Sequence, residues 1–299
     1  THNCETCGVD CASRSSAQKQ QDFKVNAHPL SNIKKVIAVV SGKGGVGKSL
    51  VTSLLASAMQ ARGKACAVLD ADITGPSIPK SFGIHQHATG TEEYLIPVTT
   101  HSGIQVMSIN LILQDETEPV VWRGPVIAGA VTQFWTDVIW GDKDVLFIDM
   151  PPGTGDIQLS LSQEVPLTGA VVVTTPQDIA LMDARKGLVM FEKVNVPILG
   201  IIENMATHIC SKCGHEEHIF GEGGAAKMAE QYGVELLGEL PLDINIRLSM
   251  DKGEPIVISE PDSKVAQAYR DIARKLAIAV SKKNKDYSAK MPSIKVSDT

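Results

Sequence analysis

The nine residues SGKGGVGKS, at positions 41–49, constrain the fold more than any other feature of the chain. They follow an apolar run, KKVIAVV, and precede apolar residues with helical spacing at Leu50, Val51, Leu54 and Leu55. A glycine-rich loop between a buried strand and a helix points backbone N–H groups and the positive end of the helix dipole at one place. The segment therefore predicts a strand–loop–helix unit that binds a phosphate group, rather than a turn that only packs the helix on the strand.

Two phosphate-binding patterns fit this loop. Gly42, Gly44 and Gly47 match G-x-G-x-x-G, the pattern of dinucleotide-binding domains. That pattern also requires an acidic residue at the end of the next strand, about 20 residues further on, and Asp70 fits this position. However, the dinucleotide interpretation gives no role to the lysine and serine that directly follow the last glycine.

The nucleoside-triphosphate pattern G-x-x-x-x-G-K-[ST] accounts for these residues. We expect Lys48 to reach the β- and γ-phosphates and the Ser49 hydroxyl to bind Mg²⁺, while Asp149, at the end of the strand in FIDMPPG, holds the ion through water. The triphosphate interpretation is therefore preferred. The predicted loop and metal residues are Gly42, Gly44, Gly45, Val46, Gly47, Lys48, Ser49 and Asp149.

Strands that are apolar throughout alternate with helical segments, which predicts an α/β fold with a mostly parallel sheet covered by helices on both faces. Ligands of such sheets bind at the carboxyl ends of the strands. We expect one ATPase domain over residues 34–281, between a flexible cysteine-containing tail (1–33) and a polar tail (282–299). The expected strands are 34–42, 65–72, 94–100, 104–109, 144–149, 169–176, 196–205 and 234–242, with 94–109 as a possible hairpin. The expected helices are 50–59, 127–139, 178–194 and 265–280.

Composition excludes several classes of protein. The net charge of −6 gives no broad basic field for nucleic acid, and no apolar run reaches the roughly 18 residues of a membrane span. The first residues lack the apolar core of a signal peptide. We therefore expect a cytoplasmic protein whose six cysteines are ligands or free thiols, with Cys66 buried in an apolar strand.

The loop carries an additional lysine after its first glycine, Lys43, and in this it resembles the deviant P-loop ATPases. That group includes the nitrogenase iron protein, the plasmid-partition ATPases and the septum-site ATPases. Within it, the chain is most similar to the Mrp-type iron–sulfur cluster carrier ATPases, over about residues 33–281. The segments that carry this resemblance are LDADITGPSIP (69–79), VVWRGP (120–125), IDMPPGTGDIQLSL (148–161) and CSKCGHEEHIFGEGG (210–224).

The resemblance implies a homodimer that encloses two ATP molecules. Lys43 would then reach across to the phosphates of the partner chain, a cation supplied in trans to the developing phosphate charge. A solvated loop lysine is the alternative. Asp72 matches the aspartate that orients the attacking water or accepts its proton. Lys43, Lys48 and Asp72 are thus the predicted catalytic residues.

Further positions match the family motifs. Gly153 in PPGTG is expected to sense the γ-phosphate, so that hydrolysis releases its loop. Asn204 and Asp243 match positions that contact adenine. Asp70 is either a metal-site acid or a salt-bridged structural carboxylate. For Arg123, a surface ion pair is an alternative to a role near the nucleotide.

Cys210 and Cys213 form a CxxC after an apolar strand, and two thiolates at this spacing can bind one metal centre. They make half a site, which a two-fold dimer would complete with four thiolates. The resemblance implies a bridging [4Fe–4S] cluster. Structural zinc with His215 and His218 remains possible, although that spacing is cramped, and so does a redox dithiol.

Cys4, Cys7 and Cys11 lie in the N-terminal segment. Their spacing resembles part of a ferredoxin motif, but the four-cysteine form found in some family members is incomplete here. A cluster there would need His2, a second chain or an external ligand. A thiol-rich tail without metal is the alternative.

Together these features predict an ATP-hydrolysing [4Fe–4S] cluster carrier that transfers its cargo to apo-proteins, with cluster scaffold proteins as possible further partners. Two other functions remain open. One is an ATP-switched positioning protein. The negative net charge and the absence of an amphipathic C-terminal segment argue against it. The other is an ATP-coupled electron donor, which would require a stable redox cluster. We expect neither a membrane nor nucleic acid as a partner.

Overall fold

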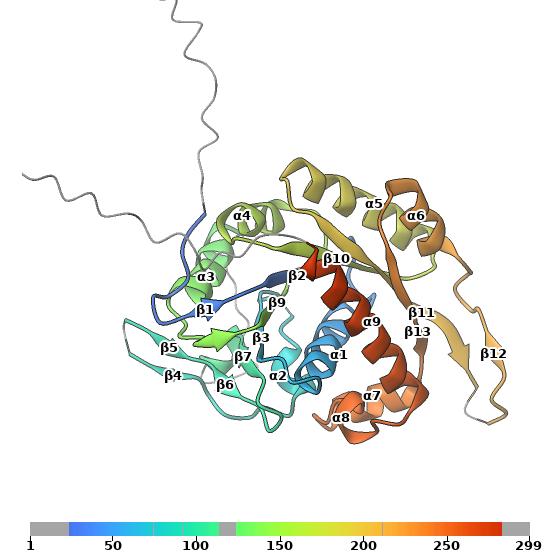
Figure 1. Ribbon diagram of the computed structural model, residues 1–299, viewed down its shortest axis with the longest axis horizontal. Coiled ribbons are helices and arrows are strands. Elements are labelled where there is room, and N and C mark those ends of the chain that lie inside the picture. The colour runs from blue at the N-terminus through green and yellow to red at the C-terminus, as the bar shows by residue number, and fades with distance from the viewer. Residues whose placement is uncertain (1–23, 74, 92, 114–123, 211, 283–299) are drawn as a thin grey trace, which may run out of the picture.

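The computed structural model describes residues 24–73, 75–91, 93–113, 124–210 and 212–282 (Figure 1). Its main sheet contains β2 (Val36–Val40), β3 (Cys66–Asp70), β6 (Val98–Thr99), β7 (Gln105–Met107), β9 (Val145–Asp149), β10 (Gly169–Thr174), β11 (Ile198–Ile209), β12 (Glu216–Glu217) and β13 (Leu236–Leu242). Within the described residues the order is β12-β11-β10-β2-β9-β3-β7-β6, with β13 also on β11. The pairs are parallel except β6–β7 and β11–β12, which confirms the predicted parallel sheet and its hairpin.

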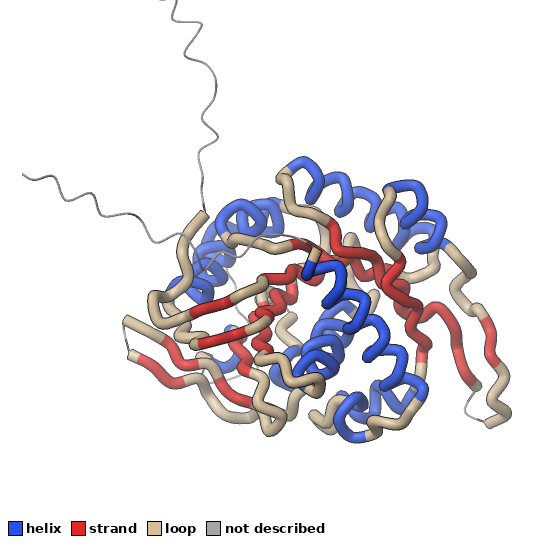
Figure 2. Tube along the Cα trace, in the orientation of Figure 1, coloured by secondary structure: helices blue, strands red, loops and turns tan. Residues whose placement is uncertain are grey.

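Helices cover both faces of this sheet, as the prediction required (Figure 2). One layer consists of α1 (Lys48–Gln60), α2 (Ile78–Ser81), α7 (Ile244–Asp251), α8 (Ile256–Ser259) and α9 (Lys264–Ser281). The other consists of α3 (Gly124–Thr136), α4 (Asp156–Glu164), α5 (Asp178–Lys193) and α6 (Gly224–Tyr232). Helices α2, α4, α6, α7 and α8 were not predicted from the sequence.

Strand β2 illustrates why the central strands are apolar throughout. Successive side chains of a strand point to opposite faces, so Ile37 and Val39 join the core under α1 and α9. Val36, Ala38 and Val40 join the core under the other helices. Because both faces are covered, a polar residue at any of these positions would be buried. The strand can therefore place polar groups only beyond its carboxyl end.

The predicted helix over residues 127–139 is too long. Helix α3 ends at Thr136, and the chain then runs beside the short strand β5 (Leu95–Ile96). The Leu95 N–H donates to the carbonyl of Asp137, and the Ile139 N–H donates to the carbonyl of Leu95. Val138 therefore faces Leu95 in a parallel bridge held by the backbone of Asp137 and Ile139, and β5 also pairs with β4 (Thr89–Gly90).

Residues 24–33 were expected in the N-terminal tail, but they pack on the domain. The Val25 N–H donates to the Glu164 carbonyl, and the Trp135 indole donates to the Val25 carbonyl at 3.0 Å. The short strand β1 (Asn32–Ile33) pairs in parallel with β8 (Asp142–Lys143). The rest of both predicted tails, residues 1–23 and 283–299, lies outside the described residues.

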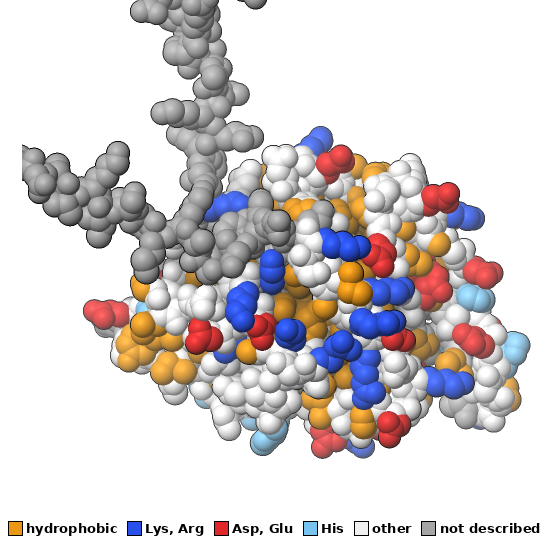
Figure 3. Space-filling model, viewed as in Figure 1, with side chains coloured by type: hydrophobic (Ala, Val, Ile, Leu, Met, Phe, Trp, Pro, Cys, Tyr) orange, Lys and Arg blue, Asp and Glu red, His pale blue; other side chains and the backbone are white. Residues whose placement is uncertain are grey.

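A cavity of about 400 Å³ opens at the amino-terminal edge of the sheet, between the starts of β2 and β9 and the end of α9. Its floor is apolar, and Figure 3 shows Lys and Arg side chains gathered around an apolar area between α1 and α9. The cationic residues that line it are Lys34, Lys35, Arg62 and Lys64. This edge lies opposite the phosphate loop, so the cavity takes no part in the site described below.

In the part of the chain that the structure describes, no helix is both long enough and apolar enough to cross a membrane.

Candidate nucleotide and metal sites

The phosphate loop joins the carboxyl end of β2 to the first residue of α1. Gly45 and Gly47 both have φ of +82°, a left-handed conformation that glycine adopts without steric cost. A Cβ at Gly42 would clash with the backbone of Asp183 in α5, and one at Gly47 would clash with the side-chain amide of Asn204. These glycines are therefore required by the loop's conformation and by its close packing, independently of any ligand.

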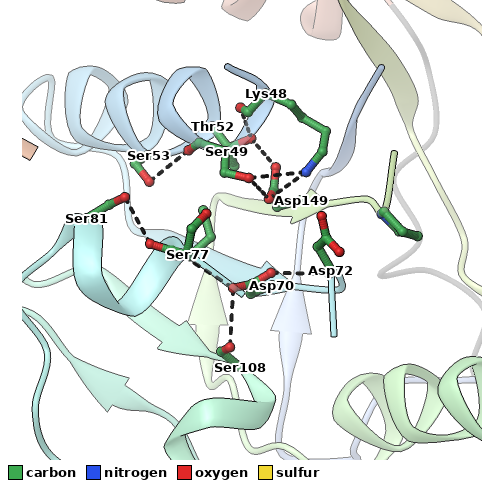
Figure 4. Close-up of polar contacts among 12 residues, drawn as sticks. Lys48, Ser49, Thr52, Ser53, Asp70, Asp72, Ser77, Ser81, Ser108 and Asp149 are labelled. Carbon is green, nitrogen blue, oxygen red and sulfur yellow. Dashed lines mark hydrogen bonds and ion pairs between the residues drawn. The ribbon is translucent and has the colours of Figure 1, made fainter. Parts of the chain in front are cut away.

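Lys48 forms a buried ion pair at the centre of the site. Its Nζ lies 2.7 Å from Oδ2 of Asp149, and their side chains are 5% and 0% exposed (Figure 4). The Ser49 hydroxyl donates to the same carboxylate oxygen at 2.5 Å. β9 lies next to β2 in the sheet, so its last residue, Asp149, is beside the loop. The three residues expected at the triphosphate and its metal are thus in direct contact.

Thr52 is an additional member of this cluster that the sequence analysis missed. Its hydroxyl donates to Oδ1 of Asp149 at 2.8 Å, so both carboxylate oxygens accept hydrogen bonds. The available signal was its position, one helical turn after Lys48. Thr52 is fully buried, and it fixes the orientation of the carboxylate towards Ser49.

The Ser49 hydroxyl and the Asp149 carboxylate suit Mg²⁺, which prefers oxygen ligands and keeps several waters. Their oxygens are 2.5 Å apart at the mouth of the loop, so one hydrated ion can contact both groups. The residues present therefore fit the predicted metal. Lys48 competes for the same carboxylate oxygen.

Asp70 lies directly opposite Asp149 in the pairing of β3 with β9. Its carboxylate accepts hydrogen bonds from the N–H groups of Asp72 and Ile78 and from the Ser108 hydroxyl, at 3.2, 3.3 and 3.2 Å. Burial and the charge of Asp149 raise the pKa of Asp70. These contacts tie the segment after β3 to the sheet, so Asp70 acts as a hydrogen-bonded structural carboxylate here.

The other predicted loop residues surround this centre. Lys43 is exposed, as a residue that reaches another chain must be. Asp72 is half-buried and lies beside the Lys48–Asp149 pair in Figure 4. Gly153 has φ of +97°, and its N–H donates to the Ser41 carbonyl at the end of β2. The loop at Gly153 is therefore hydrogen-bonded to the end of the strand that leads into the phosphate loop.

The two predicted adenine contacts differ in position. Asn204 is buried, and its Nδ2 donates to the Val46 carbonyl of the phosphate loop at 2.9 Å. Asp243 is half-buried and caps the start of α7, where it accepts from the Asn245 N–H at 2.7 Å. Both side chains thus have a structural role in this fold, and their contact with adenine stays a prediction.

Cys210 follows the last residue of β11 and opens a tight loop. Its N–H donates to the His215 carbonyl at 2.9 Å, and its carbonyl accepts from the Gly214 N–H at 2.8 Å. Cys210 is half-buried and Cys213 is exposed, and both are free thiols. Hydrogen bonds from the N–H groups of Lys212 and Cys213 lower the pKa of the Cys210 thiol, which favours the thiolate needed by a metal.

The histidines near this loop do not complete a zinc site. His218 Nδ1 donates to the Ala206 carbonyl at 3.0 Å, which leaves Nε2 as the ring nitrogen that could bind a metal. Among the residues that the structure describes, no three His, Cys, Asp or Glu side chains are grouped closely enough to hold a metal ion. Within the described residues, the CxxC therefore supplies half a site. Burial raises the pKa of the Cys66 thiol to about 12, as expected for a core cysteine.

Four predicted cysteine-site residues and one arginine lie outside the described residues: His2, Cys4, Cys7, Cys11 and Arg123.

Comparison with known proteins agrees with this arrangement. The chain is 53% identical over 250 residues to the iron-sulfur cluster carrier protein of Pseudomonas fragi, which covers 82% of this chain and 85% of that protein. It is 47% identical to the mouse iron-sulfur cluster transfer protein NUBPL, over 82% of this chain and 77% of that protein. A solved nucleotide-binding protein from Archaeoglobus fulgidus, in complex with ADP, is 40% identical, with a TM-score of 0.68 over 79% of this chain and 91% of that one.

The family model described as ParA, NUBPL iron-transfer P-loop NTPase, matches residues 32–277. This range begins at β1 and ends within α9, so it takes in the phosphate loop and the CxxC. The chain therefore belongs to the NUBPL-type iron-transfer P-loop NTPases of the ParA family.

Proposed function

We propose that this protein is an ATP-hydrolysing carrier that holds a [4Fe–4S] cluster between two copies of the chain and transfers it to apo-proteins. One observation carries the proposal. The phosphate loop and the CxxC lie at the same carboxyl edge of one sheet, and in the described residues no third His, Cys, Asp or Glu side chain joins the two cysteines. The family match and the names of the relatives favour this function over a positioning protein or an electron donor.

The nucleotide chemistry follows from the buried cluster around Asp149. In our proposal, the triphosphate draws Lys48 away from Asp149, which frees the carboxylate to hold hydrated Mg²⁺ together with the Ser49 hydroxyl. Bound Mg²⁺ would supply charge neutralisation between the β- and γ-phosphates. Thr52 keeps the carboxylate oriented throughout. Asp72 orients the attacking water, and the loop at Gly153 responds to the γ-phosphate.

Dimer formation would complete the hydrolytic site. Lys43 is exposed at the loop, where it can reach the phosphates of a facing copy. A cation supplied in trans stabilises charge in the transition state of phosphoryl transfer, so hydrolysis becomes dependent on association. We therefore expect slow turnover that rises with protein concentration.

The same two-fold axis would complete the metal site. Cys210 and Cys213 supply two thiolates, and a second copy supplies two more, the number that a [4Fe–4S] cluster requires. A cluster shared between chains is released when the chains separate, which suits transfer to acceptors. We place the activity in the reducing cytoplasm, where the thiols stay available. The function of the N-terminal cysteines stays open within this proposal.

The proposal is tested by measuring iron, sulfide and zinc per chain after anaerobic reconstitution. The parent chain is compared with the Cys210→Ala/Cys213→Ala variant and with Cys66→Ala, a matched control that removes a buried thiol. We expect iron with sulfide at about four irons per two chains in the parent and in the control. The double variant should lose this iron and the associated dimer, and still bind ATP.

Zinc without sulfide in the parent would contradict the proposal and make the CxxC a structural site. Residual iron in the double variant would belong to Cys4, Cys7 and Cys11, which are outside the described residues. Transfer itself is then followed by the gain of activity of an apo-protein that needs a [4Fe–4S] cluster, with ATP present or omitted.

A further inference from the structure

Strand β11 connects the two candidate sites. Its first part lies within the sheet, where Val171–Thr174 of β10 pair with residues up to Glu203. Its last part carries the CxxC loop, since His208 and Ile209 pair with β12 and Cys210 follows directly. Asn204, close to the phosphate loop, and Cys210 are six residues apart, about 20 Å along an extended strand.

The strand is interrupted between these two parts. In its pairing with β13, Glu203 lies opposite Glu239, while Thr207 lies opposite Pro241. Four residues along β11 thus match two along β13, which makes residues 204–206 a bulge. Met205 within it has φ of +57°, a left-handed conformation that side-chain-bearing residues rarely adopt. In the described residues, Asn195 is the other non-glycine residue with positive φ.

Both ends of the bulge contact a functional loop. On one side, the Asn204 amide donates to the Val46 carbonyl, and the absence of a side chain at Gly47 makes room for that amide. On the other side, the Ala206 carbonyl accepts from His218, which follows β12 on the returning arm of the CxxC loop. The bulge is therefore hydrogen-bonded to the phosphate loop and to the cysteine hairpin at once.

A strained backbone persists where the surrounding contacts hold it, and bulges next to functional sites re-aim side chains. A change in the phosphate loop that moves the Val46 carbonyl must either break its bond to Asn204 or move the bulge. Movement of the bulge displaces the Ala206 carbonyl and the hairpin bonded to it. Coupling of this kind is reciprocal, so a metal on the cysteines alters nucleotide affinity by the same factor.

We propose that the 204–206 bulge is the hinge through which the nucleotide state of the phosphate loop sets the position of Cys210 and Cys213. Asn204 is a positioning residue in this hinge, and Met205 fixes its conformation. The inference deepens the proposed function, on which it rests for the identity of the cargo. It assigns to particular residues the link between ATP and the metal site.

The hinge is tested on metal-free full-length chain, by the rate at which iodoacetamide alkylates Cys210 and Cys213, with and without Mg-ATP. Each cysteine is quantified in its own peptide, so other thiols do not interfere. In the parent, nucleotide should change these rates by about fivefold or more. Light scattering on the same samples reports association, so covering of the thiols by a partner chain is measured separately.

Met205→Gly should reduce the nucleotide-dependent change to less than about twofold, because glycine adopts both left-handed and extended conformations and no longer fixes the bulge. Met205→Asn should retain the parent's response, since asparagine tolerates the left-handed conformation but is less free than glycine. Asn195→Gly is the matched control, as it changes the other positive-φ residue, in the turn before β11, and should respond like the parent. Asn204→Ala, assayed at saturating nucleotide, should lose the response.

A parent without nucleotide-dependent alkylation, or a Met205→Gly variant that keeps the full response, would overturn the hinge. These outcomes are separate from the iron assay. A parent that carries iron but shows no response keeps the proposed function and refutes the hinge. A parent that binds no iron but shows the response, lost in Met205→Gly, refutes the cargo and retains the coupling.

Discussion

The Lys48–Asp149 pair predicts that the phosphate-loop lysine stabilises the protein in the absence of any nucleotide. We consider Lys48→Met, which keeps the length of the side chain and removes its charge. In the nucleotide-free protein, the lysine ammonium lies 2.7 Å from a carboxylate that is fully buried. Breaking a buried pair by removing one partner leaves an uncompensated charge, at a cost of about 3–5 kcal/mol.

Two features of the structure set the expected loss within that range. Ser49 and Thr52 continue to donate to Asp149, so its carboxylate is not left without partners. Asp70, opposite on β3, also loses the charge of Lys48, which lowers its pKa, so this second buried carboxyl becomes still harder to ionise. We therefore expect a loss of about 3 kcal/mol in the free energy of unfolding, near the lower limit for a broken buried pair.

The Lys48→Met/Asp149→Asn variant is the internal control, because it removes both charges. The asparagine oxygen can still accept a hydrogen bond from Ser49 or Thr52. Urea denaturation of the parent, both single variants and the double variant gives a double-mutant cycle, with EDTA present and nucleotide absent. We expect a favourable coupling energy of about 2 kcal/mol between the two residues.

The reasoning fails if Lys48→Met is as stable as the parent within about 0.5 kcal/mol, since surface charges typically show changes of that size. It also fails if the two single losses simply add in the double variant. Either result would mean that the ammonium and the carboxylate do not interact in the nucleotide-free protein. The lysine would then serve the phosphates alone.

Three further predictions concern the glycines of the phosphate loop, the Asp70 carboxyl and the reactivity of the cysteines. Gly47→Ala should weaken ATP binding, measured by fluorescence titration, much more than Gly45→Ala, since both have φ of +82° but an added Cβ clashes only at Gly47. Asp70→Asn should gain stability relative to the parent as pH rises from about 5 to 8. The Asp70 carboxyl is almost fully ionised above about pH 5 in the unfolded chain, whereas its raised pKa makes ionisation unfavourable in the folded one; urea denaturation at both pH values measures this. In the metal-free protein at pH 7, Cys210 should be alkylated quickly, whereas Cys66 should stay unmodified until the protein unfolds, as peptide mass spectrometry would report.

The parallel sheet could be predicted because its central strands are buried on both faces and therefore apolar throughout. β2, β9 and β10 are of this kind, and each was predicted close to its observed limits. Short helices with few apolar residues were harder to recognise from the sequence. Helix α4 has few apolar residues and follows a Gly-rich loop, and α7 and α8 are short, so none of them gives a long apolar period.

The residues of the candidate site also include some that the sequence could predict and some that it could not. Lys48 and Ser49 lie within one contiguous motif, and Asp149 could be placed beside them because parallel strands end at one edge of the sheet. Thr52 was missed because a threonine inside a helix carries no sign of its partner, which is 97 residues away. The left-handed conformation of Met205 could not be predicted, since methionine has no preference for it and the surrounding contacts impose it.

The relative position of the phosphate loop and the CxxC bears on the mechanism proposed above. Both lie at the carboxyl edge of one sheet, and one strand, β11, contacts the phosphate loop at Asn204 and leads to Cys210. In the proposed dimer, association of the two chains about a single two-fold axis would complete both sites at once. Nucleotide binding and cluster binding would therefore each favour association. In this proposal, hydrolysis would release the cluster indirectly, because loss of the γ-phosphate would weaken the association that brings the four thiolates together. Such a carrier would not need to bury the metal within one chain, and the half-buried Cys210 and exposed Cys213 would leave the cluster accessible for release.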